Sequence, residues 1–254
     1  MNAVMRTLAA ATILLAGSLL APPATAGEHP HDATAMHSFA DVEHWTAVFD
    51  DPARDAWQKP EELVAALGLR PGMRVADLGA GTGYLEHRLS AAVGPRGAVL
   101  AIDTEPALVE HLRARAEKEH LDNVTPILAS TDLARIPARS VDLVLILDTY
   151  HHIGDRLTYL AGLGRALRPD GRIAIVDWQK RELPVGPGIA HKLARAHVVG
   201  EMEEAGYQLA EEPAILPYQY FLVFRPKPRA GRARVRRPGI EPGTHGLKGR
   251  CSAD

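Results

Sequence analysis

The sequence predicts an α/β fold, with a seven-stranded and mostly parallel sheet, helices on both of its faces and an antiparallel hairpin at its end. Short apolar segments alternate with segments of helical periodicity over most of the chain, which is typical of βαβ units. The last two apolar segments, 207–211 and 218–224, are separated by too few residues for a crossover helix. They are therefore predicted to pair as an antiparallel hairpin.

Five further strands are expected before this hairpin. The segment Val141–Leu147 is apolar at almost every position, as expected of a central parallel strand that is covered on both faces. The predicted strands are, in chain order, 74–78, 98–103, 124–128, 141–147 and 172–177.

Helices are expected between the strands and ahead of the first one. Pro60 suits the first turn of a helix, and Gly68 and Gly206 suit helix ends. A turn is expected at Pro169-Asp170-Gly171. The predicted helices are 39–49, 51–57 and 61–67, which form a helical cap (residues 39–67), and then 84–93, 106–119, 156–167 and 194–205.

Composition and charge restrict the class of protein. Hydrophobic residues make up 46% and charged residues 24% of the 254 residues, which argues against a collagen-like or wholly disordered chain. The one cysteine, Cys251, excludes an intramolecular disulfide and a multi-cysteine metal cluster. Residues 27–224 carry a formal charge of −10, which argues against a nucleic acid as the partner.

The two ends of the chain differ from the body. Met1–Ala26 has a basic residue, an apolar run and a small-residue end, the pattern of a secretory signal peptide. We expect cleavage after Ala26 and a periplasmic or secreted protein without stable membrane insertion; an uncleaved membrane anchor is the alternative. Residues 27–38 are expected to be a flexible leader, 39–227 the folded domain, and 228–254 a disordered basic tail, either native or non-native.

The most informative segment is Val75–Tyr84 (VADLGAGTGY), in which a buried strand leads into glycines that open a helix. Glycines allow left-handed backbone angles and the close approach of a ligand. A dinucleotide site needs its third glycine where Tyr84 stands, so a bound pyrophosphate is not expected. Asp103 ends the second strand, where a carboxylate can accept hydrogen bonds from both hydroxyls of a ribose.

This segment resembles the first motif of class I S-adenosylmethionine-dependent methyltransferases. Asp103, the segment 130–132, Asp148 and the turn before the fifth strand match further features of that family in the same order. The resemblance covers about residues 55–225 and implies the Rossmann-like methyltransferase fold. The family's cofactor, S-adenosyl-L-methionine, is implied with it.

The resemblance also implies roles for individual residues. The glycines would pass under the methionine part of the cofactor, Asp77 would fix the loop and the amino group, and Asp103 would hold the ribose. Thr131 and Asp132 would face the adenine, and an aromatic ring would favour the sulfonium. The cofactor-binding residues expected are thus Asp77, Gly79, Gly81, Gly83, Tyr84, Asp103, Thr131, Asp132 and Asp148.

The candidate catalytic residues are Tyr150, His151 and His152. They follow the fourth strand, at the edge where open α/β sheets bind their ligands. Either histidine could take a proton from the acceptor near neutral pH, and Tyr150 is a candidate for the sulfonium. Alternatively, one histidine caps the next helix and the other packs in the core. No complete metal site is expected.

The predicted function is a methyltransferase acting on a small-molecule acceptor by direct displacement of the methyl group. The alternative is a non-catalytic protein of the same fold that binds a nucleoside or another small ligand. Aminopropyl transfer and nicotinamide-dependent oxidation are less favoured, because no acidic pair is evident beyond Asp148 and Tyr84 replaces the third glycine. The oligomeric state is not predicted.

Overall fold

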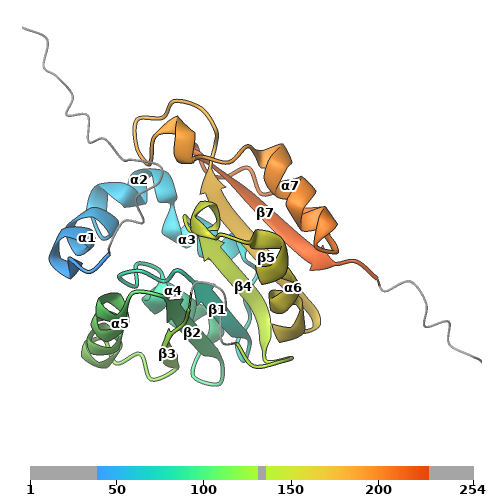
Figure 1. The fold of residues 1–254 in the computed structure, drawn as a ribbon. Coiled ribbons are helices and arrows are strands. Elements are labelled where there is room, and N and C mark those ends of the chain that lie inside the picture. Colours follow the sequence, from blue (N-terminus) through green and yellow to red (C-terminus); the bar gives the residue numbers. More distant parts are fainter. Residues whose placement is uncertain (1–38, 131–135, 229–254) are drawn as a thin grey trace, which may run out of the picture. The chain divides into compact units, whose positions relative to one another are not determined.

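The structure is a computed structural model that describes residues 39–130 and 136–228, and its centre is one seven-stranded sheet (Figure 1). The strands are β1 (Arg74–Leu78), β2 (Ala98–Asp103), β3 (Val124–Leu128), β4 (Val141–Leu147), β5 (Leu167–Trp178), β6 (Tyr207–Glu211) and β7 (Gln219–Pro226). Their order in the sheet is β3-β2-β1-β4-β5-β7-β6. The first five strands are parallel, and β7 is antiparallel to both β5 and β6, which confirms the predicted fold class.

The helices occur where the sequence predicts them. They are α1 (Val42–Phe49), α2 (Asp55–Gln58), α3 (Pro60–Ala66), α4 (Glu86–Val93), α5 (Pro106–Lys118), α6 (Arg156–Ala166) and α7 (Arg195–Glu204), with short 3-10 helices η1 (Pro52–Arg54), η2 (Tyr150–His152) and η3 (Ile189–His191). Proline is the first residue of α3 and α5, and Gly94 and Gly206 follow α4 and α7 with positive φ.

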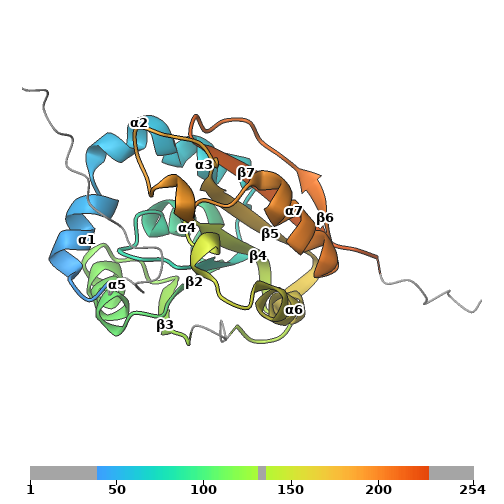
Figure 2. The same cartoon turned by 45° about the horizontal axis from the view of Figure 1, so that its top comes forward.

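Two hydrophobic clusters cover the two faces of the sheet, because successive strand residues point to opposite sides. On one face, Leu63 of α3 and Leu89 of α4 pack over Val75 and Leu143. On the other face, helices α6 and α7 pack over the alternate residues of the same strands. Figure 2 shows α7 lying in front of β5 and β7.

Strand β5 begins five residues earlier than predicted. Leu167 pairs with Val141 and Arg172 pairs with Leu143, with a shift of register between the two pairs. Asp170 has a φ of 68°, in the left-handed region, so the chain bends where a turn was expected. The prediction that the strand starts at Arg172 was wrong, because strand pairing resumes on the N-terminal side of this bend.

The first part of the helical cap reaches the carboxyl end of the sheet. The Asp50 carboxylate accepts hydrogen bonds from the Thr82 hydroxyl at 2.8 Å and from Arg115 at 2.7 Å. The Tyr84 hydroxyl donates to Asp55 at 2.6 Å. The cap therefore contacts the segment that follows β1. Within residues 39–130 and 136–228, no helix has the length and apolar character needed to cross a membrane.

Candidate active site

The glycine loop after β1 has the backbone that the sequence predicts. Gly79, Gly81 and Gly83 have φ values of 76°, 59° and 89°, which side-chain-bearing residues rarely adopt. A Cβ added to Gly79 would lie 2.8 Å from the Cβ of Thr149 and nearer still to the Thr149 hydroxyl. The loop thus needs glycine both for its conformation and for its contact with the segment after β4.

Asp103 is held directly against this loop. Its Oδ2 accepts the Gly81 N–H at 2.8 Å, and its Oδ1 accepts the N–H groups of Thr104 at 2.7 Å and Glu105 at 3.0 Å. Burial raises the pKa of Asp103, and these hydrogen bonds oppose that rise. The glycine loop and the acid that ends β2 are therefore side by side, with the carboxylate oriented by three backbone groups.

A second, buried acid lies next to Asp77, and the sequence analysis did not identify it. Asp77 is 3% exposed and Glu86 is 2% exposed. Among the described residues, the Asp77 Oδ1 and both oxygens of Glu86 have no hydrogen-bond partner. Burial raises the pKa of Asp77 to about 7, and burial followed by the charge of Asp77 raises the pKa of Glu86 well above its usual value.

This carboxyl pair fits a cationic group. Burying two carboxyl groups whose oxygens lack hydrogen-bond partners costs less free energy when an ammonium lies between them. S-Adenosylmethionine carries an ammonium, and the open backbone of the glycine loop is where its amino-acid part would pass. The chemistry of Asp77, Glu86 and Asp103 therefore fits that cofactor. Glu86 could have been found in the sequence, since it shares a helix face with Leu89 and Val93.

Tyr84, which follows the loop, has one of its faces covered. The Arg54 guanidinium lies 4.1 Å from the centre of the ring. Burial, and then the hydrogen bond to Asp55, raises the pKa of the Tyr84 hydroxyl. The ring that was expected to favour a sulfonium thus already contacts a cation from the helical cap.

Asp148 connects the helical cap to strand β7 through hydrogen bonds. It accepts a hydrogen bond from Arg54 at 3.1 Å and another from the Gln219 amide, and Gln219 in turn accepts one from Gln58 at 2.6 Å. Burial raises the pKa of Asp148 to about 7, while Arg54 opposes that rise. Sequence analysis did not identify Arg54 and Gln58, because they lie about 90 and 160 residues away from their partners along the chain.

The three candidate catalytic residues in η2 have different surroundings. Tyr150 is fully buried, and its hydroxyl donates to Glu201 at 3.0 Å, which favours a structural role. The Nδ1 of His151 lies 2.8 Å from the Oδ1 of Asp177. The ring of His152 lies 4.1 Å from that of His151 and 6.1 Å from that of Phe39, centre to centre.

Two of the predicted cofactor residues, Thr131 and Asp132, lie outside the described residues, so their role remains a prediction. In the described ranges, no group of three or more histidine, cysteine or acidic side chains is placed to hold a metal ion. The remaining predicted residues lie at the ends of β1 and β2 or follow β1 or β4, at the carboxyl end of the sheet.

Comparisons with known proteins agree with this geometry. A family model described as a methyltransferase domain matches residues 69–213. The chain is 29% identical over 125 residues to the ubiquinone/menaquinone biosynthesis C-methyltransferase UbiE of Shewanella sp. strain W3-18-1, which covers 49% of each protein. It is 30% identical over 155 residues to UbiE of Shewanella frigidimarina, covering 57% of this chain and 61% of the relative. The chain thus spans about half the length of the curated relatives it matches.

A solved structure covers more of the fold. The crystal structure of a SAM-dependent methyltransferase from Aquifex aeolicus superposes with a TM-score of 0.69 at 29% identity. The match covers 72% of this chain and 97% of that protein. With the strand order, the glycine loop and the family match over residues 69–213, the conclusion is that the chain belongs to the class I S-adenosylmethionine-dependent methyltransferases.

Proposed function

We propose that this protein transfers the methyl group of S-adenosylmethionine to a small molecule by direct displacement. The observation that carries the proposal is the hydrogen bond from the Gly81 N–H to Asp103, which holds the acid proposed to bind the ribose against the glycine loop. Because displacement at a methyl carbon needs alignment of two reactants, positioning supplies much of the rate.

The proposed binding roles follow the geometry. Asp103 would accept hydrogen bonds from the ribose hydroxyls, and Asp77 with Glu86 would surround the ammonium of the methionine part. Asp148 would help to shape the site through its contacts with Arg54 and Gln219. When bound, the cofactor supplies an electrophilic methyl group on a sulfonium. The residues proposed to line its path are Asp77, Gly79, Gly81, Gly83, Tyr84, Asp103, Thr131 and Asp132.

A small molecule is proposed as the acceptor for two reasons. The curated relatives are named for ubiquinone and menaquinone biosynthesis, which concerns small organic acceptors. In addition, residues 27–224 carry a formal charge of −10, which does not suit a polyanionic substrate.

Calorimetry with S-adenosylhomocysteine tests the cofactor site. Saturable binding is expected, and Asp103→Ala should weaken it about 10- to 100-fold, because hydrogen bonds to a charged group are lost. Asp122→Ala is the matched control, since Asp122 is an exposed acid in the loop before β3. Absence of saturable binding would contradict the proposal. Binding without methyl transfer over a broad acceptor panel would favour the ligand-binding alternative.

We also propose that the protein is exported and cleaved after Ala26, on the signal-peptide pattern of Met1–Ala26. The cofactor is made in the cytosol, so an exported enzyme requires a supply of it outside. N-terminal sequencing after cell fractionation tests the proposal. A periplasmic or secreted chain beginning at Gly27 is expected, and an intact Met1 in the cytosol would refute it.

A further inference from the structure

The two acids next to the glycine loop, Asp77 and Glu86, are buried together and are called here the carboxyl pair. Asp77 stands on β1, two residues ahead of Gly79, and Glu86 is the first residue of α4. Within residues 39–130 and 136–228, the Asp77 Oδ1 and both Glu86 oxygens have no hydrogen-bond partner. Burial of two charged carboxylates without partners costs far more free energy than burial of neutral groups.

The positive charges that act on the carboxyl pair belong to side chains that bond other acids. Burial raises the pKa of both members, while the charge of Arg54 opposes that rise in the first acid and the charge of Arg115 opposes it in the second. However, Arg54 donates to Asp148 at 3.1 Å, and Arg115 donates to Asp50 at 2.7 Å. Neither guanidinium therefore serves the pair as its own counter-ion.

A shared proton accounts for two acids that are buried side by side. Two ionised carboxylates can only accept hydrogen bonds, so neither can bond the other. When Glu86 carries a proton, its O–H can donate to Asp77, and a side-chain hydrogen bond joins these two groups. The negative charge of Asp103 acts in the same direction, because it raises the pKa of Asp77.

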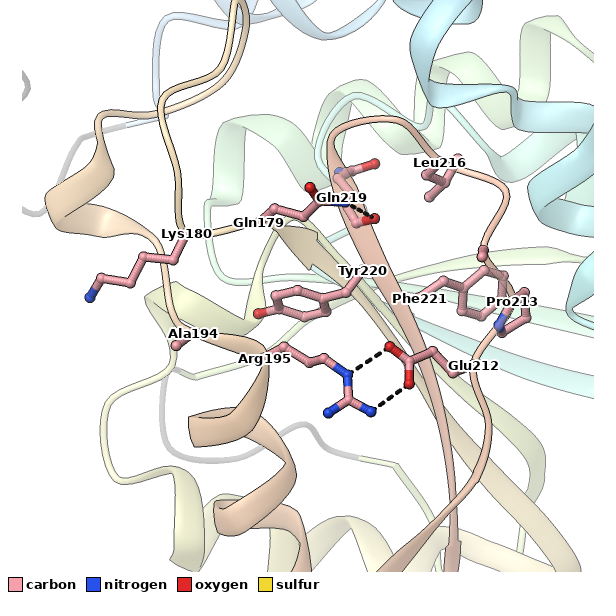
Figure 3. Close-up of a pocket in the computed structure, with 11 residues that line it drawn as sticks. Gln179, Lys180, Ala194, Arg195, Glu212, Pro213, Leu216, Gln219, Tyr220 and Phe221 are labelled. Atoms are coloured by element: carbon pink, nitrogen blue, oxygen red, sulfur yellow. Dashed lines mark hydrogen bonds and ion pairs between the residues drawn. The ribbon is translucent and has the colours of Figure 1, made fainter.

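Glu212, in contrast, has a counter-ion within the protein. It stands in the wall of a cavity of about 410 Å³ beside the first half of β7 (Figure 3). The Arg195 guanidinium donates to both of its carboxylate oxygens, and these hydrogen bonds lower the pKa of Glu212. Glu212 therefore remains ionised, whereas the carboxyl pair lacks the cation that would allow both of its members to ionise.

A primary ammonium matches the carboxyl pair in charge and in its number of hydrogen bonds. It has three N–H donors. The Asp77 Oδ1 and the two Glu86 oxygens are three acceptors that lack partners in the described part of the chain. The positive charge of an ammonium also favours the ionised form of both acids. A proton held between the carboxylates competes with the ammonium for the same oxygens, so binding of the ammonium should expel it.

We propose that the carboxyl pair shares one proton in the free protein and releases it when the ammonium of S-adenosylmethionine binds, so that affinity for the cofactor rises with pH. This inference rests on the proposed function. The O–H bond of Glu86 breaks, its electron pair stays on the carboxylate, and the proton passes to water. Because the bound state then holds one proton fewer than the free state, affinity should rise by up to about tenfold per pH unit.

Calorimetry with S-adenosylhomocysteine tests the proposal when it is repeated in buffers of different ionisation enthalpy. The slope of the binding enthalpy against the buffer's ionisation enthalpy gives the number of protons released. Between about pH 6 and 7, where an α-amino group stays protonated, the wild type should release about one proton per ligand bound.

The ligand control is 5′-methylthioadenosine, which has the nucleoside and the thioether but no amino acid. It should release almost no proton from the carboxyl pair, since it brings no ammonium. It also controls for Asp103, whose pKa is raised by burial and which is proposed to bind the ribose of both ligands.

Glu86→Gln should reduce the proton release with S-adenosylhomocysteine to about half a proton or less, because an amide does not titrate. Glu110→Gln is the matched control variant, since Glu110 is an exposed acid on α5. It should release as many protons as the wild type.

The outcomes separate this inference from the proposed function. Failure of the wild type to bind S-adenosylhomocysteine would overturn the proposed function. Normal binding with an enthalpy that does not depend on the buffer would overturn the shared proton alone. Equal release with both ligands, or equal release in the wild type and Glu86→Gln, would also overturn it. The comparison of the two ligands needs only the wild type, so it decides the question even where Glu86→Gln does not fold.

Discussion

Individual residues determine how closely the site is packed. Gly79 and Gly81 both have positive φ, but their surroundings differ. A Cβ on Gly79 would overlap Thr149, whereas a Cβ on Gly81 would meet only Phe49, at 3.6 Å, and the carbonyl of Gly79, at 4.0 Å. A comparison of alanine substitutions at the two glycines therefore distinguishes the cost of backbone strain from the cost of a steric clash.

Gly79→Ala is expected to destabilise the protein by about 3 kcal/mol, because strain and overpacking add. Gly81→Ala should cost only about 1–2 kcal/mol, from the backbone conformation. Urea unfolding of both variants measures the difference. Equal losses of stability would show that the contact with Thr149 is not tight.

The buried acids Asp77 and Glu86 should make stability depend on pH. Both have a folded-state pKa above the unfolded value, so the stability that they contribute at low pH is lost as pH rises, for Asp77 from about 4 through about 7. Glu86→Gln should make this loss of stability smaller, because the amide does not titrate. Urea unfolding without cofactor at pH 5, 7 and 8.5 measures it.

Glu110→Gln is the control for that measurement, since Glu110 is an exposed acid on α5. Its stability should follow the wild type at every pH. Parallel curves for Glu86→Gln and the wild type would mean that the pair does not titrate in this range.

Residue contacts across the chain were only partly predictable. The glycine loop and Asp103 are neighbours because the ends of adjacent parallel strands meet, which the strand pattern alone implies. The sequence analysis did not identify the contact between Asp177 and His151, which lie 26 residues apart along the chain. The available signal was that His151 follows β4 and Asp177 lies near the end of β5, the neighbouring strand.

Among the secondary structure elements, the helical cap depends on the body for its position. Arg54 donates to Asp148 at 3.1 Å, to the carbonyl of Phe49 at 3.0 Å and to Gln58 at 3.1 Å. A single guanidinium thus holds α1, α2 and the end of β4 together.

Arg54→Ala should loosen the cap, because it leaves the partly buried Asp148 without its positive partner. The backbone amides of residues 42–58 should exchange with deuterium at least about tenfold faster than in the wild type. Arg113→Ala, which removes an exposed ion pair with Glu110, serves as the control. Unchanged exchange in the cap would show that other contacts hold it.

The elements also show where sequence patterns suffice. Strands β1 to β4 have the predicted bounds, and the apolar runs of β1, β2 and β4 end at glycine or aspartate. The start of β5 was missed because a bend at Asp170 looks like a turn in sequence, and only pairing of Leu167 with Val141 shows that the strand continues.

At the scale of the whole molecule, the residues that form the hydrophobic core all belong to the segment from the cap to β7. Both hydrophobic clusters are built from residues 63–224. A fragment of residues 39–228 is therefore expected to keep its Tm within about 3 °C of the full chain and to bind S-adenosylhomocysteine with the same affinity. Calorimetry checks both. A lower Tm or a tenfold weaker affinity would assign a role to the remaining residues.

The three tryptophans of the chain have a practical consequence. Trp45 stacks on Phe49 in α1, with ring centres 5.1 Å apart, whereas Trp57 in α2 of the cap lies against Trp178 at the end of β5. Any detachment of the cap must separate Trp57 from Trp178 and change the polarity around both indoles. The intrinsic fluorescence of the unlabelled protein should therefore report, in real time, when the cap separates from the end of β5.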